Sequence, residues 1–168
     1  MIHYNNLKVY VLGSFALLMG NIYGQEVNID NVPTLLKKNA VYGTVGSLGL
    51  GFTHYSVNVE RTLWDTNGII TNMRVRLGGG QWTEVSWGDE PQEDLHFIGS
   101  LNVLTGYRTF HLELGLGASY IRHIDYGDSI VSPNVILGIR LQKPGGNVIF
   151  RFGGGFPEEV YLSLGVAF

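Results

Sequence analysis

The chain has 168 residues, which allows one domain, and only 15% of them are charged, below the quarter or so that is usual in soluble domains. Its formal net charge of −3 argues against nucleic acid as a partner, because nucleic-acid binding needs a basic surface. Cysteine is absent, which excludes a disulfide framework and thiolate chemistry, and the mean hydropathy of +0.11 is too low for a bundle of membrane helices.

The N-terminus carries the pattern of a secretory signal peptide. Lys8 precedes an apolar run at 9–19, and small or polar residues follow up to Gln25. We expect cleavage after Gly24. The run is short for a membrane anchor, which needs about 20 residues. Residues 25–38 then form a lead-in, which we expect on the periplasmic side and with little order.

From residue 39 to the end, apolar and polar side chains alternate with a period of two. Leu112, Leu114 and Leu116 share one face, whereas His111 and Glu113 share the other, and the same pattern runs through 161–168. Successive side chains of a strand point to opposite faces, so this period predicts strands and not helices.

Turn signals rich in Gly, Pro, Asn and Asp divide 39–168 into eight segments. The predicted strands are 40–50, 52–64, 71–85, 94–105, 110–124, 130–142, 147–156 and 160–168. Segments of this length suit tilted membrane strands and are long for a soluble sheet. We therefore predict an all-β fold, an eight-stranded antiparallel transmembrane β-barrel with up-and-down meander connections. With the C-terminus in the periplasm, the connections at 49–51, 87–94, 125–129 and 156–159 become outer loops.

Six charged residues fall opposite the apolar faces of these strands. An arginine that faced lipid at mid-depth would cost about 2–4 kcal/mol, so in a membrane barrel these side chains must point inward. We expect them to form an Arg/Glu network that plugs the lumen, with glycines on the inner face making room for it. The network residues are Glu60, Arg74, Arg76, Glu113, Arg140 and Arg151, and the glycines are Gly78, Gly80, Gly115, Gly153 and Gly165.

Aromatic residues lie near the ends of several predicted strands. Amphipathic rings favour the two interfaces of a bilayer, so we expect these side chains there. They are Tyr55, Trp64, Trp82, Trp87, Tyr107, Tyr120 and Phe156.

The chain ends in Gly165, Val166, Ala167 and Phe168, which resembles the C-terminal signal that the barrel assembly machinery of the outer membrane recognises. With its strand count and patterning, the stretch 40–168 is similar to the small eight-stranded outer-membrane barrels of the OmpA/OmpX type. This resemblance implies a place in the outer membrane of a Gram-negative bacterium, with outer-membrane lipid and lipopolysaccharide around it and the assembly machinery as a partner during insertion.

A soluble lipocalin barrel is the structural alternative. Gly80, Gln81 and Trp82 match the G-x-W motif of that family, but in lipocalins the motif opens the first strand, and here it ends the third.

The sequence predicts no metal, no cofactor and no catalytic site. His54, His96, His111 and His123 lack the spacing of a metal-binding motif, and we expect the first three in the polar lining of the lumen. An enzyme that modifies lipid A is the functional alternative. Its candidate residues in the loop after the fifth strand are His123, Asp125, Asp128 and Ser129.

We favour a non-enzymatic barrel with a structural or interaction role. It stabilises the membrane or serves as an accessory subunit beside a larger outer-membrane complex, with a membrane protein as its partner. The longest predicted outer loop is acidic and is the candidate contact outside the membrane. Its residues are Trp87, Asp89 and Glu90, followed by Glu93 and Asp94.

Overall fold

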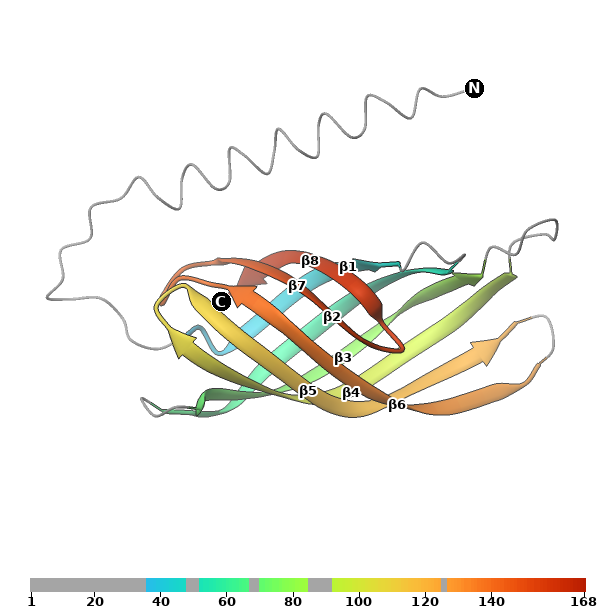
Figure 1. The fold of residues 1–168 in the computed structure, drawn as a ribbon, viewed down its shortest axis with the longest axis horizontal. Helices are drawn as coiled ribbons and strands as arrows, with labels where there is room; N and C mark the ends of the chain where they lie inside the picture. Colours follow the sequence, from blue (N-terminus) through green and yellow to red (C-terminus); the bar gives the residue numbers. More distant parts are fainter. Residues whose placement is uncertain (1–35, 48–51, 67–69, 85–91, 125–126) are drawn as a thin grey trace, which may run out of the picture. The chain divides into compact units, whose positions relative to one another are not determined.

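A computed structural model describes residues 36–168 apart from 48–51, 67–69, 85–91 and 125–126, and the predicted signal peptide, residues 1–24, lies outside this part. The described chain forms eight strands in one closed antiparallel barrel with neighbours in sequence order (Figure 1). The strands are β1 (Asn39–Gly46), β2 (Phe52–Asp65), β3 (Ile70–Glu84), β4 (Gln92–Tyr107), β5 (Phe110–His123), β6 (Ser129–Leu141), β7 (Val148–Phe156) and β8 (Glu159–Ala167). The predicted fold class is therefore confirmed.

The barrel closes between its first and last strands. β1 pairs with β8 from Ala40 opposite Ala167 to Gly46 opposite Tyr161, and the backbone amides of Asn39 and Phe168 each donate to the other residue's carbonyl, at 3.0 and 2.9 Å. We call the end of the barrel that holds Asn39 and Phe168 the base and the opposite end the rim. β1 ends at Gly46, and the last part of the predicted strand, 48–50, lies outside the described residues.

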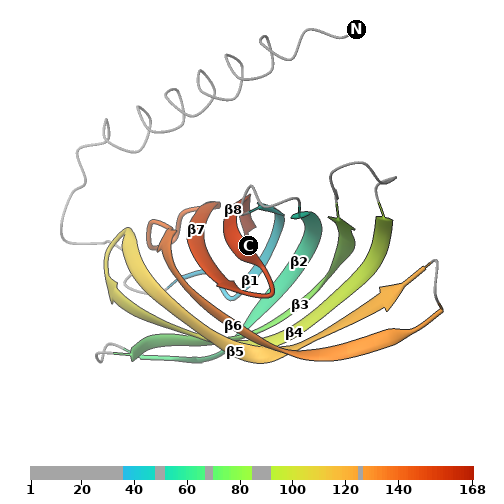
Figure 2. The same ribbon diagram turned by 45° about the vertical axis from the view of Figure 1, so that its right-hand side comes forward.

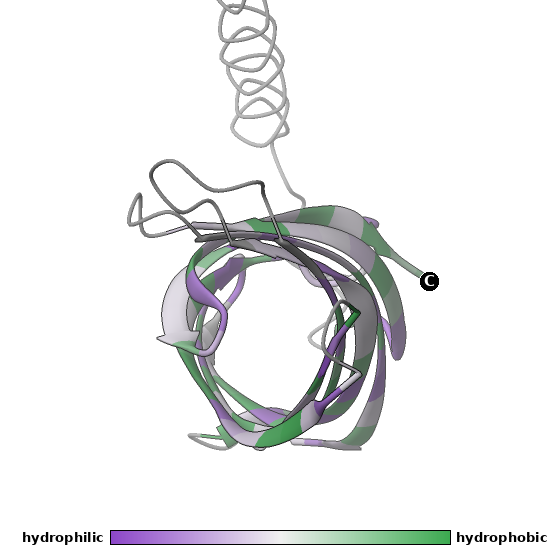
Figure 3. Ribbon diagram, turned by 90° about the vertical axis from the view of Figure 1, so that its right-hand side faces the viewer, coloured by the Kyte–Doolittle hydropathy of each residue, from purple (hydrophilic) through white to green (hydrophobic). Residues whose placement is uncertain are grey.

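Apolar side chains cover the outside of the barrel, and polar side chains fill the inside. Leu112, Leu114 and Leu116 are about half exposed, whereas His111 and Glu113 on the same strand are buried. Figure 3, a view along the barrel axis, shows the strands as a closed ring. A water-soluble monomer rarely leaves so large an apolar surface uncovered, and an apolar exterior is consistent with a membrane barrel.

Glycines on the inner face allow close packing of the lumen. A Cβ atom on Gly78 would collide with the side chain of Asn58, and one on Gly165 with Tyr42. Gly153 lies against the hydroxyl of Tyr161. The space beside these glycines was predicted to hold the charged network itself. It is filled instead by Asn58, Tyr42 and Tyr161, which in turn contact the arginines.

The end of the lead-in is held against the base, contrary to the expectation of little order for all of 25–38. The side chain of Leu36 is buried, the carbonyl of Lys37 accepts a hydrogen bond from Arg74 Nη2 at 2.6 Å, and the carbonyl of Lys38 accepts one from the amide of Thr62 at 2.7 Å. These three residues directly precede β1 and contact β2 and β3 through their backbone or are buried. The described residues include no apolar helix of membrane-spanning length.

The barrel wall has unequal height at the rim. β7 pairs with β6 only from Val135 downward, so among the described residues Ser129–Asn134 pair with β5 alone. Figure 2 shows the β7–β8 hairpin turning well short of the β5–β6 hairpin. The hairpin turns at Pro157 and Glu158, after a cis peptide bond between Phe156 and Pro157.

Candidate functional site

Among the described residues, the lumen holds seven buried arginine and glutamate side chains, and they form three ion-pair groups. All six residues of the predicted network are buried, and Glu158 joins them. Nearest the base, Glu60 Oε2 accepts from Arg140 Nη1 at 2.6 Å and lies 3.8 Å from Arg74 Nη1. Its other oxygen accepts from the hydroxyl of Tyr42 at 2.5 Å. This group connects strands β1, β2, β3 and β6.

The second group joins Glu113 on β5 to Arg151 on β7. Arg151 donates from Nε and from Nη2 to the two carboxylate oxygens, each at 2.8 Å, and Asn102 on β4 donates to Glu113 at 2.6 Å. Such a two-bond arrangement between guanidinium and carboxylate is the strong form of this interaction.

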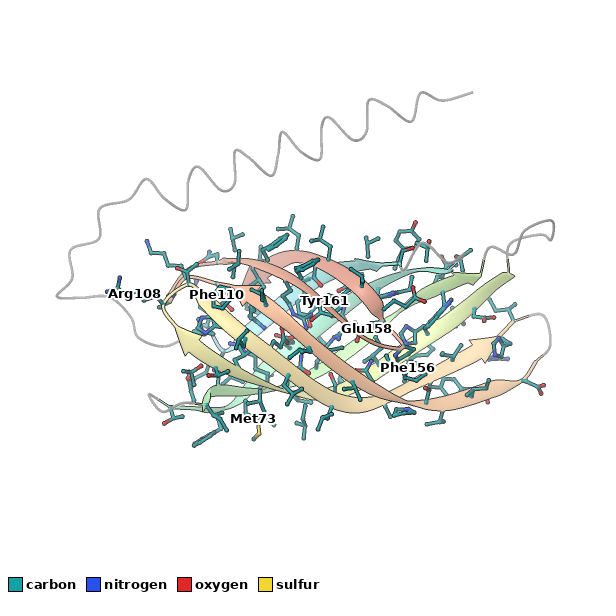
Figure 4. All side chains as sticks on the ribbon, viewed as in Figure 1. Met73, Arg108, Phe110, Phe156, Glu158 and Tyr161 are labelled. Atoms are coloured by element: carbon teal, nitrogen blue, oxygen red, sulfur yellow. The ribbon has the colours of Figure 1, made fainter. Side chains whose placement is uncertain are left out.

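The third group joins Arg76 on β3 to Glu158 in the β7–β8 turn. The two guanidinium nitrogens Nη1 and Nη2 lie 2.7 and 2.9 Å from the two oxygens of Glu158. Asn134 donates to Glu158 at 3.0 Å, and Asn58 accepts from Arg76 Nε at 2.8 Å. Figure 4 labels Glu158 where β7 turns into β8.

The segment 156–159 connects β7 to β8 at the rim, but the side chain of Glu158, which was not predicted inside, is fully buried in the lumen. A turn residue has no alternation that could place its side chain inside. The charge count carried a signal, because four inward arginines faced only Glu60 and Glu113 in the predicted network. A third inward carboxylate would bring the negative charge closer to the positive charge of the four arginines.

Tyr42 and Tyr161 connect the groups through their rings. The guanidinium carbon of Arg151 lies 4.5 Å from the ring centre of Tyr42 and 5.4 Å from that of Tyr161, and Arg76 lies 5.8 Å from Tyr42. These distances are typical of cation–π contacts. Tyr42 was not predicted to lie in the lumen, because apolar and polar residues alternate poorly along its strand.

Toward the rim, the lumen contains a ring cluster of His54, Trp82 and His96. The ring centres of Trp82 and His96 are 5.6 Å apart, and those of His54 and His96 are 6.1 Å apart. Trp82 was expected at a bilayer interface, and that prediction is wrong, because its register on β3 places it on the same face as Arg76. Tyr55, Trp64, Tyr120 and Phe156 point outward, and the side chains of Trp87 and Tyr107 lie outside the described part.

His111 lies at the other end of the lumen, where a ring nitrogen is 3.0 Å from the carbonyl of Arg108 in the base turn that Figure 4 labels. The three histidines are all buried, as expected, but they do not gather at one place. The described residues contain no group of three or more His, Cys, Asp or Glu side chains arranged for a metal ion.

His123, one of the candidate residues of a lipid-modifying site, contacts Asp94, which was predicted to belong to a different outer loop, 87–94. Its Nδ1 lies 2.7 Å from Asp94 Oδ2, its cross-strand neighbour on β4. Its amide donates to the carbonyl of Asp128, Ser129 begins β6, and Asp125 lies outside the described residues. Of the candidate contact loop, Trp87, Asp89 and Glu90 also lie outside the described residues.

The C-terminal residues of the assembly signal complete the barrel wall. Val166 and Phe168 are exposed on the apolar exterior, whereas Gly165 faces inward against Tyr42. The exposed row is continued by Leu162 and Leu164.

Scans against protein-family models, curated proteins and solved structures found no match to this chain. The class is therefore defined by the structure alone. The protein is an eight-stranded antiparallel barrel with buried Arg–Glu ion pairs inside and an apolar exterior, the organisation of a membrane β-barrel.

Proposed function

We propose that this protein is exported through its signal peptide and inserted in the outer membrane of a Gram-negative bacterium, where it has a structural or interaction role. It is then a barrel of the OmpA/OmpX type whose lumen is closed. The proposal is carried by one observation, the three Arg–Glu groups that lie across the lumen from base to rim.

The lumen groups support a role in rigidity over a role in transport. An eight-stranded barrel has an interior just wide enough for side chains to fill. Here, among the described residues, four arginine and three glutamate side chains occupy it. The pairs Arg140–Glu60, Arg151–Glu113 and Arg76–Glu158 each join parts of the wall that are not neighbours, whereas Arg74 and Glu60 lie on adjacent strands. We expect cross-bracing of this kind to stiffen the barrel and to prevent a continuous water path.

Conductance in planar lipid bilayers tests the closed lumen. We expect the purified, folded protein to insert and give no stable current steps. The matched variant replaces Glu113 and Arg151 by alanine together, which removes one ion pair without changing the net charge. We expect it to leak, whereas large steady steps from the unmodified protein would contradict the proposal.

Co-purification tests the interaction role. Extraction from native membranes with a mild detergent, followed by mass spectrometry of the bound proteins, should recover a reproducible membrane partner if the barrel is an accessory subunit. A variant that lacks 87–91 should lose that partner if the acidic loop makes the contact. Reproducible absence of any partner from both forms leaves the structural role and rejects the subunit role.

The lipid-modifying alternative depends on the hydrogen bond between His123 and Asp94 at the rim, which orients the imidazole. A His123→Gln variant is the matched control for this activity. Loss of acyl chains from lipid A on incubation with the unmodified protein, and not with the variant, would establish the enzyme and overturn the non-enzymatic role.

A further inference from the structure

The buried charges of the lumen do not balance. Among the described residues, four arginines and three glutamates are fully buried, which leaves an excess of one positive charge. Arg76 and Arg151 each have a carboxylate bound through two hydrogen bonds. The excess therefore falls on Arg74 and Arg140, which share Glu60 near the base.

Glu60 does not satisfy both guanidinium groups. It accepts from Arg140 Nη1 at 2.6 Å, but its distance to Arg74 Nη1 is 3.8 Å, beyond a hydrogen bond. Its second oxygen is taken by the hydroxyl of Tyr42. Within the described part of the chain, Arg74 Nη1 and Arg140 Nη2 are buried without a hydrogen-bond acceptor.

Two amide groups beside these arginines add donors to the same region. Arg74 Nε donates to Asn72 Oδ1 at 2.7 Å, and Arg140 Nε donates to Gln142 Oε1 at 2.9 Å. Because each amide oxygen faces its arginine, each amide nitrogen points elsewhere. Both of these nitrogens, Asn72 Nδ2 and Gln142 Nε2, are buried and have no acceptor among the described residues.

Four buried N–H donor groups without an acceptor and one excess positive charge thus belong to Arg74, Arg140 and the two amide side chains bonded to them. A buried donor without an acceptor costs about 1–3 kcal/mol, and more when it is charged. Water would accept hydrogen bonds but would leave the charge, and the carbonyl of Lys37 that accepts from Arg74 Nη2 carries no full charge. An anion supplies both the acceptors and the missing negative charge.

We propose that the base of the lumen binds one small oxyanion, of the size of sulfate, phosphate or acetate, between Arg74 and Arg140. Guanidinium groups suit such ligands because their planar N–H donors match the oxygen geometry of carboxylates and phosphates. Asn72 and Gln142 are the supporting donors. The site uses Arg74 and Arg140 of the ion-pair group nearest the base, and anion binding is measured independently of the conductance that tests the closed lumen.

Crystals grown or soaked in selenate, an oxyanion with an anomalous X-ray signal, test the site directly. We expect an anomalous peak within hydrogen-bond distance of Arg74 Nη1 and Arg140 Nη2. A water molecule at that position without anomalous signal would overturn the proposal, whatever the conductance of the barrel.

Thermal unfolding in non-ionic detergent gives a second readout. At constant ionic strength, replacing chloride by sulfate should raise the unfolding temperature of the protein until the site is saturated. An Arg74→Met variant should lose this rise, whereas Arg122→Gln, which removes an exposed arginine from the rim end of β5, should keep it. If Arg74→Met does not fold, Gln142→Met serves the same purpose.

The outcomes separate the possibilities. A rise that Arg122→Gln retains and the base variants lose supports the oxyanion site. Equal stability in chloride and sulfate, or equal responses of all variants, overturns it, as does a selenate peak that persists in the base variants.

Discussion

Glu158 holds both terminal nitrogens of Arg76, at 2.7 and 2.9 Å, although the glutamate belongs to a two-residue turn and the arginine to the middle of β3. This ion pair connects the β7–β8 turn, where the barrel wall is shortest, to β3 across the lumen. A hairpin whose turn is anchored inside the lumen is bound to the barrel by more than its backbone ladder.

Replacing Glu158 by glutamine should destabilise the protein by about 3–5 kcal/mol, because removal of one partner leaves the charge of Arg76 buried and unpaired. Equilibrium unfolding in detergent or lipid vesicles measures the loss. The control is Asp128→Asn, which removes one negative charge from an exposed residue and should change stability by less than about 0.5 kcal/mol. Equal effects of the two variants would show that the ion pair is not a stabilising contact.

Tyr42→Phe and Tyr161→Phe form a matched pair for the two lumen tyrosines. Tyr42 donates a hydrogen bond to the carboxylate of Glu60, so its loss should cost about 1.5–3 kcal/mol. The buried hydroxyl of Tyr161 has no hydrogen-bond partner among the described residues, so Tyr161→Phe should leave stability unchanged or increase it. Denaturant titration of both variants checks the difference, and the reverse order would contradict the assigned contacts.

An arginine on the outer face reports whether that face meets lipid. Leu114, 47% exposed near the middle of β5, should tolerate arginine poorly in a bilayer, at a cost of about 2–4 kcal/mol. Ile124, 52% exposed in the turn that follows the rim end of β5, should cost about 0–1 kcal/mol when replaced by arginine. Unfolding in lipid vesicles measures both. If both substitutions changed the free energy of unfolding by small and equal amounts, the outer face would be exposed to water and not to lipid.

Gly165→Ala and Gly43→Ala compare an inner with an outer glycine. A Cβ on Gly165 would meet the carbonyl of Val41 and the side chain of Tyr42, so overpacking should cost about 1–3 kcal/mol. A Cβ on Gly43 has no atom within 4 Å, and alanine there should be neutral or stabilise by about 0.4–1 kcal/mol. The two unfolding free energies should differ in this direction, and a stable Gly165→Ala variant would mean that the lumen packs less tightly.

The strands and their inner and outer faces were predictable from sequence because a period of two is a local property. Arg74, Glu113 and Arg151 could be placed inside because the cost of a charge in lipid selects the face. Glu158 could not be placed in this way, since a turn has no alternating faces. Tyr42 and Trp82 were missed or misplaced because the role of an aromatic ring depends on which strand lies across the lumen, which only the register of the closed barrel decides.

The short β7–β8 hairpin also constrains how the molecule sits in its bilayer. Along Ser129–Asn134, one side of the β6 backbone faces no described strand, and hydrocarbon provides nothing to which peptide groups can hydrogen-bond. Pro133 has no backbone N–H, so at this one position no hydrogen-bond acceptor is needed. In a bilayer, the hydrocarbon core on that side of the barrel should therefore end on the base side of Val135. In a bilayer, we expect local thinning there or a tilt of the barrel axis, so that the flank above β7 meets headgroups at a level where the opposite wall still meets acyl chains.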